Sequence, residues 1–228
     1  MQRVRVKIEG LRDPETAMRI AQMGADAIGV VFAEESPRWV SPEQARAIAD
    51  VLPPWVSVVG VFVNADPTVI NRVVARTRIH YVQLHGEEPP GVVEQIRAPC
   101  IKAFRVRDEG WLAEVHQWVR AVRTRSNLAA VLLDAYNPNV HGGTGERFHW
   151  DLVADARFAG RLAGIEPIIL AGGLDAKCVG QAIDVVKPWA VDVASGVEEA
   201  PGVKDLKKVE RFLRATREGE ELKTEFWL

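Results

Sequence analysis

Two glycine-rich turns near the C-terminus carry residues suited to bind a phosphate group. One short apolar run ends at Gly172 and Gly173, and a second ends close to Gly196. Each run is followed by a helical pattern, and glycine lets the backbone approach an anion closely. The N–H groups and the positive end of a following helix favour negative charge. The turns therefore predict a phosphate site, with ordinary strand-to-helix turns as the alternative.

Two acidic residues, Glu9 and Asp134, end apolar runs and are candidates for acid–base chemistry. In the first run Arg5, Lys7 and Glu9 alternate with apolar residues. Side chains along a strand point alternately to opposite faces, so the three charged residues share one face. The apolar face must meet surrounding helices, so Glu9 points to the interior, and the same rule points Asp134 inward. Such a pair can serve as general base and general acid. Helix or loop capping by each is the alternative.

Other polar residues of these runs invite weaker interpretations. Lys7, deeper than Glu9, needs a buried counter-charge, and Asp192 in the last apolar run is the candidate for a structural pair. Gln83 and His85 share one face at the end of a further run, and a lone histidine is more often a structural hydrogen-bonding group. The remaining histidines have no metal-ligand spacing, so we expect no metal site.

Eight strand patterns recur, each followed by a helical pattern. The strands are expected at Val4–Ile8, Ala27–Phe32, Val56–Val63, Ile79–Leu84, Cys100–Phe104, Ala129–Leu133, Pro167–Ala171 and Ala190–Ala194. The helices are expected at Pro14–Met23, Ser41–Val51, Pro67–Thr77, Pro90–Ile96, Trp111–Arg123, Asp151–Arg161, Ala176–Val185 and Lys204–Arg217. Three helices open with a capping residue followed by proline, at Asp13, Ser41 and Asp66.

Eight strand–helix units favour a single-domain (β/α)₈ TIM barrel over residues 1–217, with a tail at 218–228. A doubly wound sheet is the alternative, but the glycine fingerprint expected after its first strand is absent. In a barrel, the carboxyl ends of all strands share the catalytic face. That face also carries the long glycine-rich loop 136–146. The seven tryptophans are expected mainly to pack helices against the barrel.

Composition excludes several classes of protein. The formal net charge is −2 and 47% of the residues are hydrophobic, which gives no electrostatic footprint for nucleic acid. The chain has neither a long apolar run for a membrane span nor the apolar core of a signal peptide. Two cysteines are too few for a disulfide framework. We therefore expect a cytoplasmic protein that binds neither nucleic acid nor membrane.

The chain resembles the phosphoribosylanthranilate isomerase family of tryptophan biosynthesis along nearly its whole length. The segments that carry the resemblance are Val6–Leu11, Gly24–Phe32, Ser36–Pro42, Val59–Asn64, Val82–Glu88, Ile101–Phe104, Leu132–Ala135, Gly142–Gly145, Leu170–Leu174, Val191–Glu198 and Pro201–Lys204. Each segment alone is weak evidence. Their occurrence together and in this order identifies the chain as a member of the family.

The resemblance implies a cofactor-free Amadori rearrangement of N-(5-phosphoribosyl)anthranilate to 1-(2-carboxyphenylamino)-1-deoxyribulose 5-phosphate. It implies that Asp134 is the general acid and that Arg38 meets the anthranilate carboxylate, for which a guanidinium fork is suited. Further substrate contacts are implied for Gln83, His85 and Gly143. The phosphate would be held by Gly172, Gly173, Ser195 and Gly196.

One position departs from the family pattern. The first strand of the family ends Lys-Ile-Cys-Gly, and that cysteine is the general base, whereas this chain has Glu9. Cys100 begins the fifth strand, at the wrong end of the barrel, and Cys178 falls in an outer helical pattern. Carboxylate chemistry is compatible with the position, because related barrels of histidine biosynthesis use aspartate there. A carboxylate is also ionised at neutral pH.

Three functions remain open from the residues. The first is a working isomerase with Glu9 as base and Asp134 as acid. The second is a diverged paralogue that acts on another sugar phosphate, and the third is a non-catalytic sugar-phosphate binder. All three require a small sugar-phosphate ligand and no cofactor, in a protein that is a monomer or a homodimer.

Overall fold

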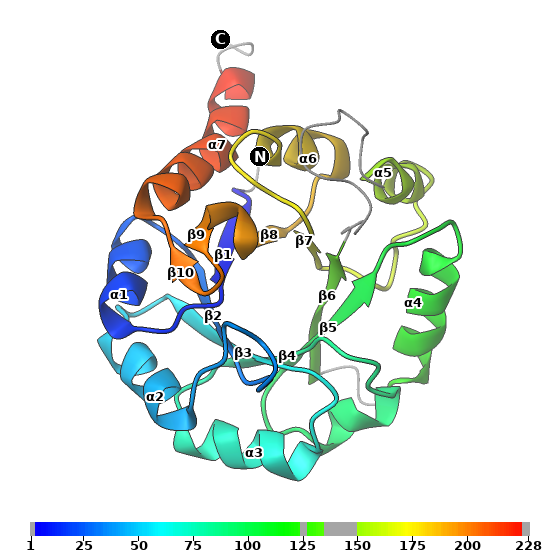
Figure 1. Cartoon of the computed structure of the whole chain (residues 1–228). Helices are drawn as coiled ribbons and strands as arrows, with labels where there is room; N and C mark the ends of the chain where they lie inside the picture. Colours follow the sequence, from blue (N-terminus) through cyan, green and yellow to red (C-terminus); the bar gives the residue numbers. More distant parts are fainter. Residues whose placement is uncertain (1–2, 124–126, 135–149, 225–228) are drawn as a thin grey trace.

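The computed structural model describes residues 3–123, 127–134 and 150–224, and its parallel strands close into a barrel in chain order from β1 to β8 (Figure 1). The (β/α)₈ barrel predicted from the sequence is thus confirmed. The strands are β1 Arg5–Glu9, β2 Ala27–Val31, β3 Ser57–Phe62, β4 Tyr81–Leu84, β5 Cys100–Arg105, β6 Leu128–Asp134, β7 Ile168–Ala171 and β8 Ala190–Val193.

Helices surround the barrel, as Figure 1 shows in a view along its axis. They are α1 Pro14–Gln22, α2 Pro42–Val51, α3 Pro67–Arg76, the 3₁₀ helix η1 Pro90–Gln95, α4 Trp111–Ala121, α5 Trp150–Phe158, α6 Val179–Val186 and α7 Leu206–Thr224. The three helix starts predicted from a capping residue and a following proline are confirmed. The side chains of Asp13, Ser41 and Asp66 each accept a hydrogen bond from a backbone N–H in the first turn, and proline follows each.

Alternation along the strands separates two apolar regions. Residues such as Val6, Ile8 and Val30 face the helices and form the main core. The opposite parity fills the barrel interior with a second cluster, which includes Val59, Ile101, Ala103, Ala130, Leu132, Ile169, Ala171 and Ala190. The strands β5, β6 and β7 therefore give the interior an apolar side, whereas β1 and β8 supply buried charges.

Several predicted elements are wrong in detail. The segment expected as a helix at Pro90–Ile96 is a 3₁₀ helix, because a run of six residues leaves room for very few i→i−4 bonds and the tighter 3₁₀ bonds suit such short pieces. Helix α6 starts later than expected, because the Asp175 carboxylate accepts from the N–H groups of Lys177 and Cys178 and holds them in a turn. A hairpin of β9 Glu198–Ala200 and β10 Val203–Lys204 precedes α7 and was not predicted.

The C-terminal helix and the tryptophans add two further observations. Helix α7 continues across position 217/218, the predicted boundary between the barrel and the tail. Trp111 and Trp150 are buried as expected, but Trp55 is 98% exposed in the turn between α2 and β3, so its predicted packing role is wrong. Among the described helices, none combines the length and the apolar character that a membrane span needs.

Candidate active site

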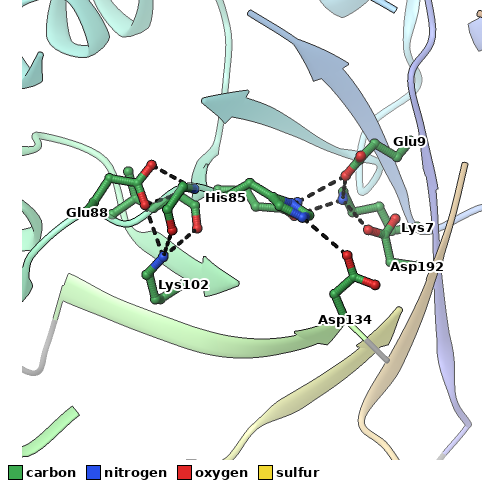
Figure 2. Close-up of polar contacts among 10 residues, drawn as sticks. Lys7, Glu9, His85, Glu88, Lys102, Asp134 and Asp192 are labelled. Atoms are coloured by element: carbon green, nitrogen blue, oxygen red, sulfur yellow. Dashed lines mark hydrogen bonds and ion pairs between the residues drawn. The ribbon is translucent and has the colours of Figure 1, made fainter. Parts of the chain in front are cut away.

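Glu9 ends β1 at the mouth of the barrel and is held by a buried ion cluster. Lys7 Nζ donates to Glu9 Oε2 at 2.6 Å and to Asp192 Oδ2 at 2.9 Å, and the Lys7 side chain is 4% exposed (Figure 2). The predicted Lys7–Asp192 pair is confirmed. Lys7 thus pairs with Glu9 as well as with Asp192. Gly29 on β2 provides the space, because a Cβ there would lie 3.0 Å from Glu9 Cγ and 3.1 Å from Lys7 Cε.

The two carboxyl groups of the cluster, Glu9 and Asp192, have very different pKa values. Burial acts to raise the pKa of Glu9, but the Lys7 ammonium and the nearby His85 lower that pKa to about 2. Burial raises the pKa of Asp192 to about 7, with Glu9 adding to the effect and Lys7 opposing it. Near neutral pH, Glu9 is therefore the ionised carboxylate of the pair, and Asp192 is the group able to hold a proton.

We expect the Asp192 carboxyl carbon to titrate near pH 7 in a ¹³C NMR experiment. In Glu9→Gln the neighbouring negative charge is gone while Lys7 remains, so the Asp192 pKa should fall. A titration of Asp192 that is identical in the two proteins would contradict this assignment of the proton.

Gln83 connects Glu9 to His85. It is fully buried, its Oε1 accepts from Lys7 Nζ at 2.9 Å, and its Nε2 lies 3.0 Å from Glu9 Oε2 and 2.9 Å from His85 Nδ1. Lys7 can only donate, so the Gln83 oxygen faces Lys7 and the amide nitrogen donates to Nδ1. The imidazole proton then belongs on Nε2. The substrate contact predicted for Gln83 stays a prediction, because the protein itself uses both ends of this amide.

His85 Nε2 points to Asp134, the last residue of β6. Figure 2 shows the two side chains facing each other, and His85 Nε2 and Asp134 Oδ2 are 3.5 Å apart. Burial opposes a charge on the ring, but the hydrogen bond to Asp134 and the charge of Glu9 raise the His85 pKa. The amide hydrogen of Gln83 acts in the opposite direction and favours the neutral ring. A polar chain thus joins the two candidate catalytic carboxylates through Gln83 and His85.

A second buried ion pair, missed in the sequence, supports His85 from the other side. Lys102 Nζ lies 3.0 Å from Glu88 Oε2 and donates to the Gly86 carbonyl at 2.7 Å (Figure 2). Glu88 Oε1 accepts from the backbone N–H of Asn64 at 2.9 Å. The pair therefore fixes the loop that follows β4 and His85. The available signal was the single lysine within an apolar run, since a buried ammonium needs a counter-charge.

Two arginines line the catalytic face beside His85. A cavity of about 550 Å³ opens over the ends of β3, β4 and β5, and its lining includes His85, Arg105, Arg107 and Trp111. Arg105 is exposed and stands opposite Asp134 in the register of β5 and β6. Sequence reasoning missed Arg105, although its position at the end of a strand was a usable signal.

Arg38, the predicted carboxylate-binding residue, already meets a carboxylate of the protein. Arg38 Nε donates to Glu198 Oε1 at 2.8 Å and Nη2 donates to Oε2 at 2.7 Å, while Nη1 takes part in neither bond. Lys204 Nζ, only 1% exposed, also binds Glu198 Oε1 at 2.9 Å. Glu198 thus ties the loop after β2 to the β9–β10 hairpin. Binding of a substrate carboxylate by Arg38 stays a prediction.

The structure brings the two predicted phosphate turns into contact. Gly172 and Gly173 follow β7 with φ angles of 91° and 62°. Ser195 and Gly196 follow β8 in the 3₁₀ turn Ser195–Val197. A Cβ at Gly196 would lie 1.9 Å from the Leu174 carbonyl oxygen, so only glycine allows the turns to pack this closely. Gly173 and Ser195 are exposed at this rim.

The remaining candidates are placed as follows. Gly143 lies outside the described residues. Cys100 begins β5 as expected, and burial raises the pKa of its thiol to about 12. Cys178 is the residue before α6 rather than part of a helix, and its Sγ accepts from the Asp175 N–H at 3.3 Å. Within the described ranges, no group of three His, Cys, Asp or Glu side chains could hold a metal ion.

The fold and the site define a class of protein: a TIM-barrel enzyme with acid–base groups at the carboxyl ends of its strands. The particular family follows from comparison, because residues 6–215 match the family of N-(5'-phosphoribosyl)anthranilate (PRA) isomerase. The chain belongs to this family, which confirms the resemblance found in the sequence.

Individual relatives agree with that assignment. The N-(5'-phosphoribosyl)anthranilate isomerase of Geobacter sulfurreducens is 46% identical over 214 residues, 94% of this chain and 98% of the relative. The crystal structure of phosphoribosyl anthranilate isomerase from Thermotoga maritima has a TM-score of 0.83 and 40% identity, covering 94% and 99% of the two chains. A solved complex of the enzyme with reduced 1-(o-carboxyphenylamino)-1-deoxyribulose 5-phosphate has a TM-score of 0.80 and 37% identity, with the same coverage.

Proposed function

We propose that the chain catalyses the Amadori rearrangement of N-(5'-phosphoribosyl)anthranilate to 1-(2-carboxyphenylamino)-1-deoxyribulose 5-phosphate. One observation carries the proposal. Glu9 and Asp134 stand on the same face, are joined through Gln83 and His85, and share that face with the phosphate turns. Membership of the PRA isomerase family and the ligand in a solved relative support this substrate.

The reaction needs two protons delivered and two removed. Asp134 gives a proton to the furanose ring oxygen, which breaks the C1–O bond and leaves a Schiff base between the sugar and the anthranilate nitrogen. Glu9 then takes the proton from C2, and the electrons of that C–H bond form the enolamine. Transfer of a proton to C1 and loss of the hydroxyl proton give the ketone. Protons delivered and removed balance, so no cofactor is required.

The ion cluster prepares Glu9 for this role and also limits it. Lys7 and Gln83 both donate to Oε2, which fixes the carboxylate at the barrel mouth and keeps it ionised. A low pKa also makes Glu9 a weaker base, since proton transfer is most efficient when the catalytic pKa lies near the working pH. Asp192 adds to this effect, because its contact with Glu9 also lowers the pKa of Glu9.

The anionic ends of the substrate have matching groups on this face. The turns at Gly173 and Ser195 offer exposed backbone for the phosphate. Arg38 and Arg105 are the cations near Glu9 and Asp134, respectively, that could meet the anthranilate carboxylate. Arg38 is the first choice, because the family resemblance assigns it this contact.

The test is turnover of N-(5'-phosphoribosyl)anthranilate, followed as loss of its anthranilate-type fluorescence. One observation favours a second function, that of a non-catalytic binder, because Lys7 holds Glu9 at 2.6 Å. Tight binding of the substrate without conversion would establish that function and contradict the isomerase proposal. A cytoplasmic location and a monomeric or homodimeric state stay predictions.

Gly173→Ala is expected to raise KM for the phosphorylated substrate about tenfold or more and to leave kcat nearly unchanged. An added Cβ at Gly173 meets no described atom within 4 Å, so the methyl group would enter the space that the phosphate needs. Alanine with a positive φ costs about 1–2 kcal/mol of stability. Steady-state kinetics on the folded variant measures the change in KM.

Gly160→Ala is the matched control. Gly160 has a φ of 67° and equally open surroundings, but it follows α5 on the outside of the barrel. Both variants should lose similar stability in thermal unfolding, and only Gly173→Ala should lose affinity. Equal KM values for the two variants would show that Gly173 does not contact the phosphate.

A further inference from the structure

A second cavity opens at the opposite end of the barrel from Glu9 and Asp134. Its volume is about 390 Å³, within the range of roughly 300–1,000 Å³ that is usual for sites of small ligands. The lining residues include Arg5, Ala27, Ser57 and Ala190, which are the first residues of β1, β2, β3 and β8. The cavity is therefore the amino-terminal mouth of the barrel.

Small side chains make this mouth hollow. Ala27, Ala130 and Ala190 line the cavity, and Ala130 and Ala190 belong to the apolar cluster of the barrel interior. Barrels usually fill such positions with bulky branched residues. Val59, Ile101 and Ile169 complete apolar walls. The walls therefore suit an apolar ligand group.

Arg5 supplies a cation on the wall of the cavity. Its guanidinium carbon lies 4.5 Å from the centre of the Trp189 ring. Its Nη1 is buried and, among residues 3–123, 127–134 and 150–224, has no hydrogen-bond partner. The acidic residue of the same cavity, Asp26, is bound by the Arg3 guanidinium and by the Val6 N–H. A buried donor without a partner favours an anionic acceptor from a ligand.

Two exposed aromatic residues frame the opening. Trp55, 98% exposed, and Trp189, 40% exposed, both line the cavity from the turns before β3 and β8. Exposed indole rings next to an apolar hollow are typical of a surface that a ligand covers.

We propose that this mouth binds a small organic carboxylate with an apolar, ring-containing body. The carboxylate accepts from Arg5 Nη1, and the body fills the hollow between Ala130 and Ala190. The site is separate from the catalytic face, with the Lys7 side chain between them: its stem lines the cavity, while its Nζ holds Glu9 and Asp192. The proposal is thus independent of the isomerase activity.

The test is calorimetric titration with 3-(4-bromophenyl)propionate and with its neutral isostere 3-(4-bromophenyl)propanamide. We expect the carboxylate to bind at least tenfold more tightly than the amide. Arg5→Met should bind the carboxylate and the amide with equal affinity. Ala130→Met, which fills the hollow and keeps Arg5, should weaken both probes at least tenfold. Circular dichroism and thermal unfolding show whether each variant is folded.

Arg107→Met is the control for loss of one positive charge, because Arg107 lines the cavity on the catalytic face. It should leave both affinities unchanged, and the anomalous signal of bromine in a crystal should lie in the hollow between Ala130 and Ala190. The proposal is overturned by equal affinities for acid and amide, by a bromine on the catalytic face, or by an equal effect of Arg107→Met. Tighter binding after removal of residues 225–228 would instead identify the chain's own end as the occupant and overturn it too.

Discussion

Glu9→Gln is expected to lower kcat for N-(5'-phosphoribosyl)anthranilate about 1,000-fold, with a small effect on KM. Glutamine has nearly the same shape and accepts the same hydrogen bonds from Lys7 and Gln83, but it cannot take the C2 proton. General base catalysis contributes roughly 10²–10⁴-fold to a rate, so the loss belongs in that range. Stopped-flow or steady-state fluorescence of the anthranilate group measures it.

Glu9→Gln should remain folded, so its loss of activity can be assigned to the missing base. The reason is that Lys7 keeps an ion-pair partner. Lys7 Nζ remains 2.9 Å from Asp192 Oδ2 when the charge at position 9 is removed, so the buried ammonium stays paired. Glu35→Gln is the matched control, since Glu35 is exposed in the loop after β2. It should keep the parent rate. Equal rates for the parent and Glu9→Gln would show that Glu9 is not the base.

Glu9→Cys separates the two chemistries by their pH dependence. The pKa of Glu9 is about 2, so loss of its charge should not reduce kcat/KM between pH 8 and pH 5. A thiol is mostly protonated at neutral pH, so the rate of Glu9→Cys should rise with pH as the thiolate forms. We expect Glu9→Cys to be far more active than Glu9→Gln. A flat profile for Glu9→Cys would contradict this account of the base.

Side chains whose direction follows from the alternation along a β-strand could be placed from the sequence. Lys7 and Glu9 alternate with valine and isoleucine, so the inward direction of both follows from the two-residue period of a strand. Asp134 and the glycine turns follow from the rule that the carboxyl ends of barrel strands share one face. Proline at the first helical position likewise marked the start of α2 and α3.

Contacts between distant segments could not be placed in this way. Gln83 lies 74 residues from Glu9, and no local pattern shows that its amide is shared between Glu9, His85 and Lys7. The Arg38–Glu198 pair joins residues 160 apart in the chain. Each depends on the side-by-side packing of segments and on side-chain length. Barrel topology alone fixes neither, so the pairing of Arg38 with Glu198 could not be predicted from the sequence.

The direct contact between Lys7 and Glu9 has a similar explanation. The sequence placed both side chains on one face but gave no distance between their charged ends. Gly29 decides that distance, because a larger residue on β2 would occupy the space where Glu9 and Lys7 meet. A glycine in a strand is usually interpreted as a weak point or a bulge, and its use as space for a neighbouring side chain is visible only in three dimensions.

Asp134→Asn is expected to lower kcat about 100- to 10,000-fold and to change KM little. Asparagine keeps the size of the side chain and its 3.5 Å approach to His85, but its amide cannot deliver a proton to the furanose oxygen. A loss confined to kcat means that the missing interaction belongs to the transition state, whereas a rise in KM alone would point to a binding role. Steady-state kinetics with saturating substrate distinguishes the two.

His85→Gln tests whether Asp134 or its neighbour delivers that proton. We place His85 as a positioning residue, since its Nδ1 accepts from Gln83 and its Nε2 faces Asp134. Glutamine can keep one of these contacts, so its kcat should fall only about tenfold and its pH profile should shift as the imidazole is removed. If His85→Gln loses as much activity as Glu9→Gln while Asp134→Asn stays active, the acid is His85. In that case the carboxylate of β6 serves only to orient the ring.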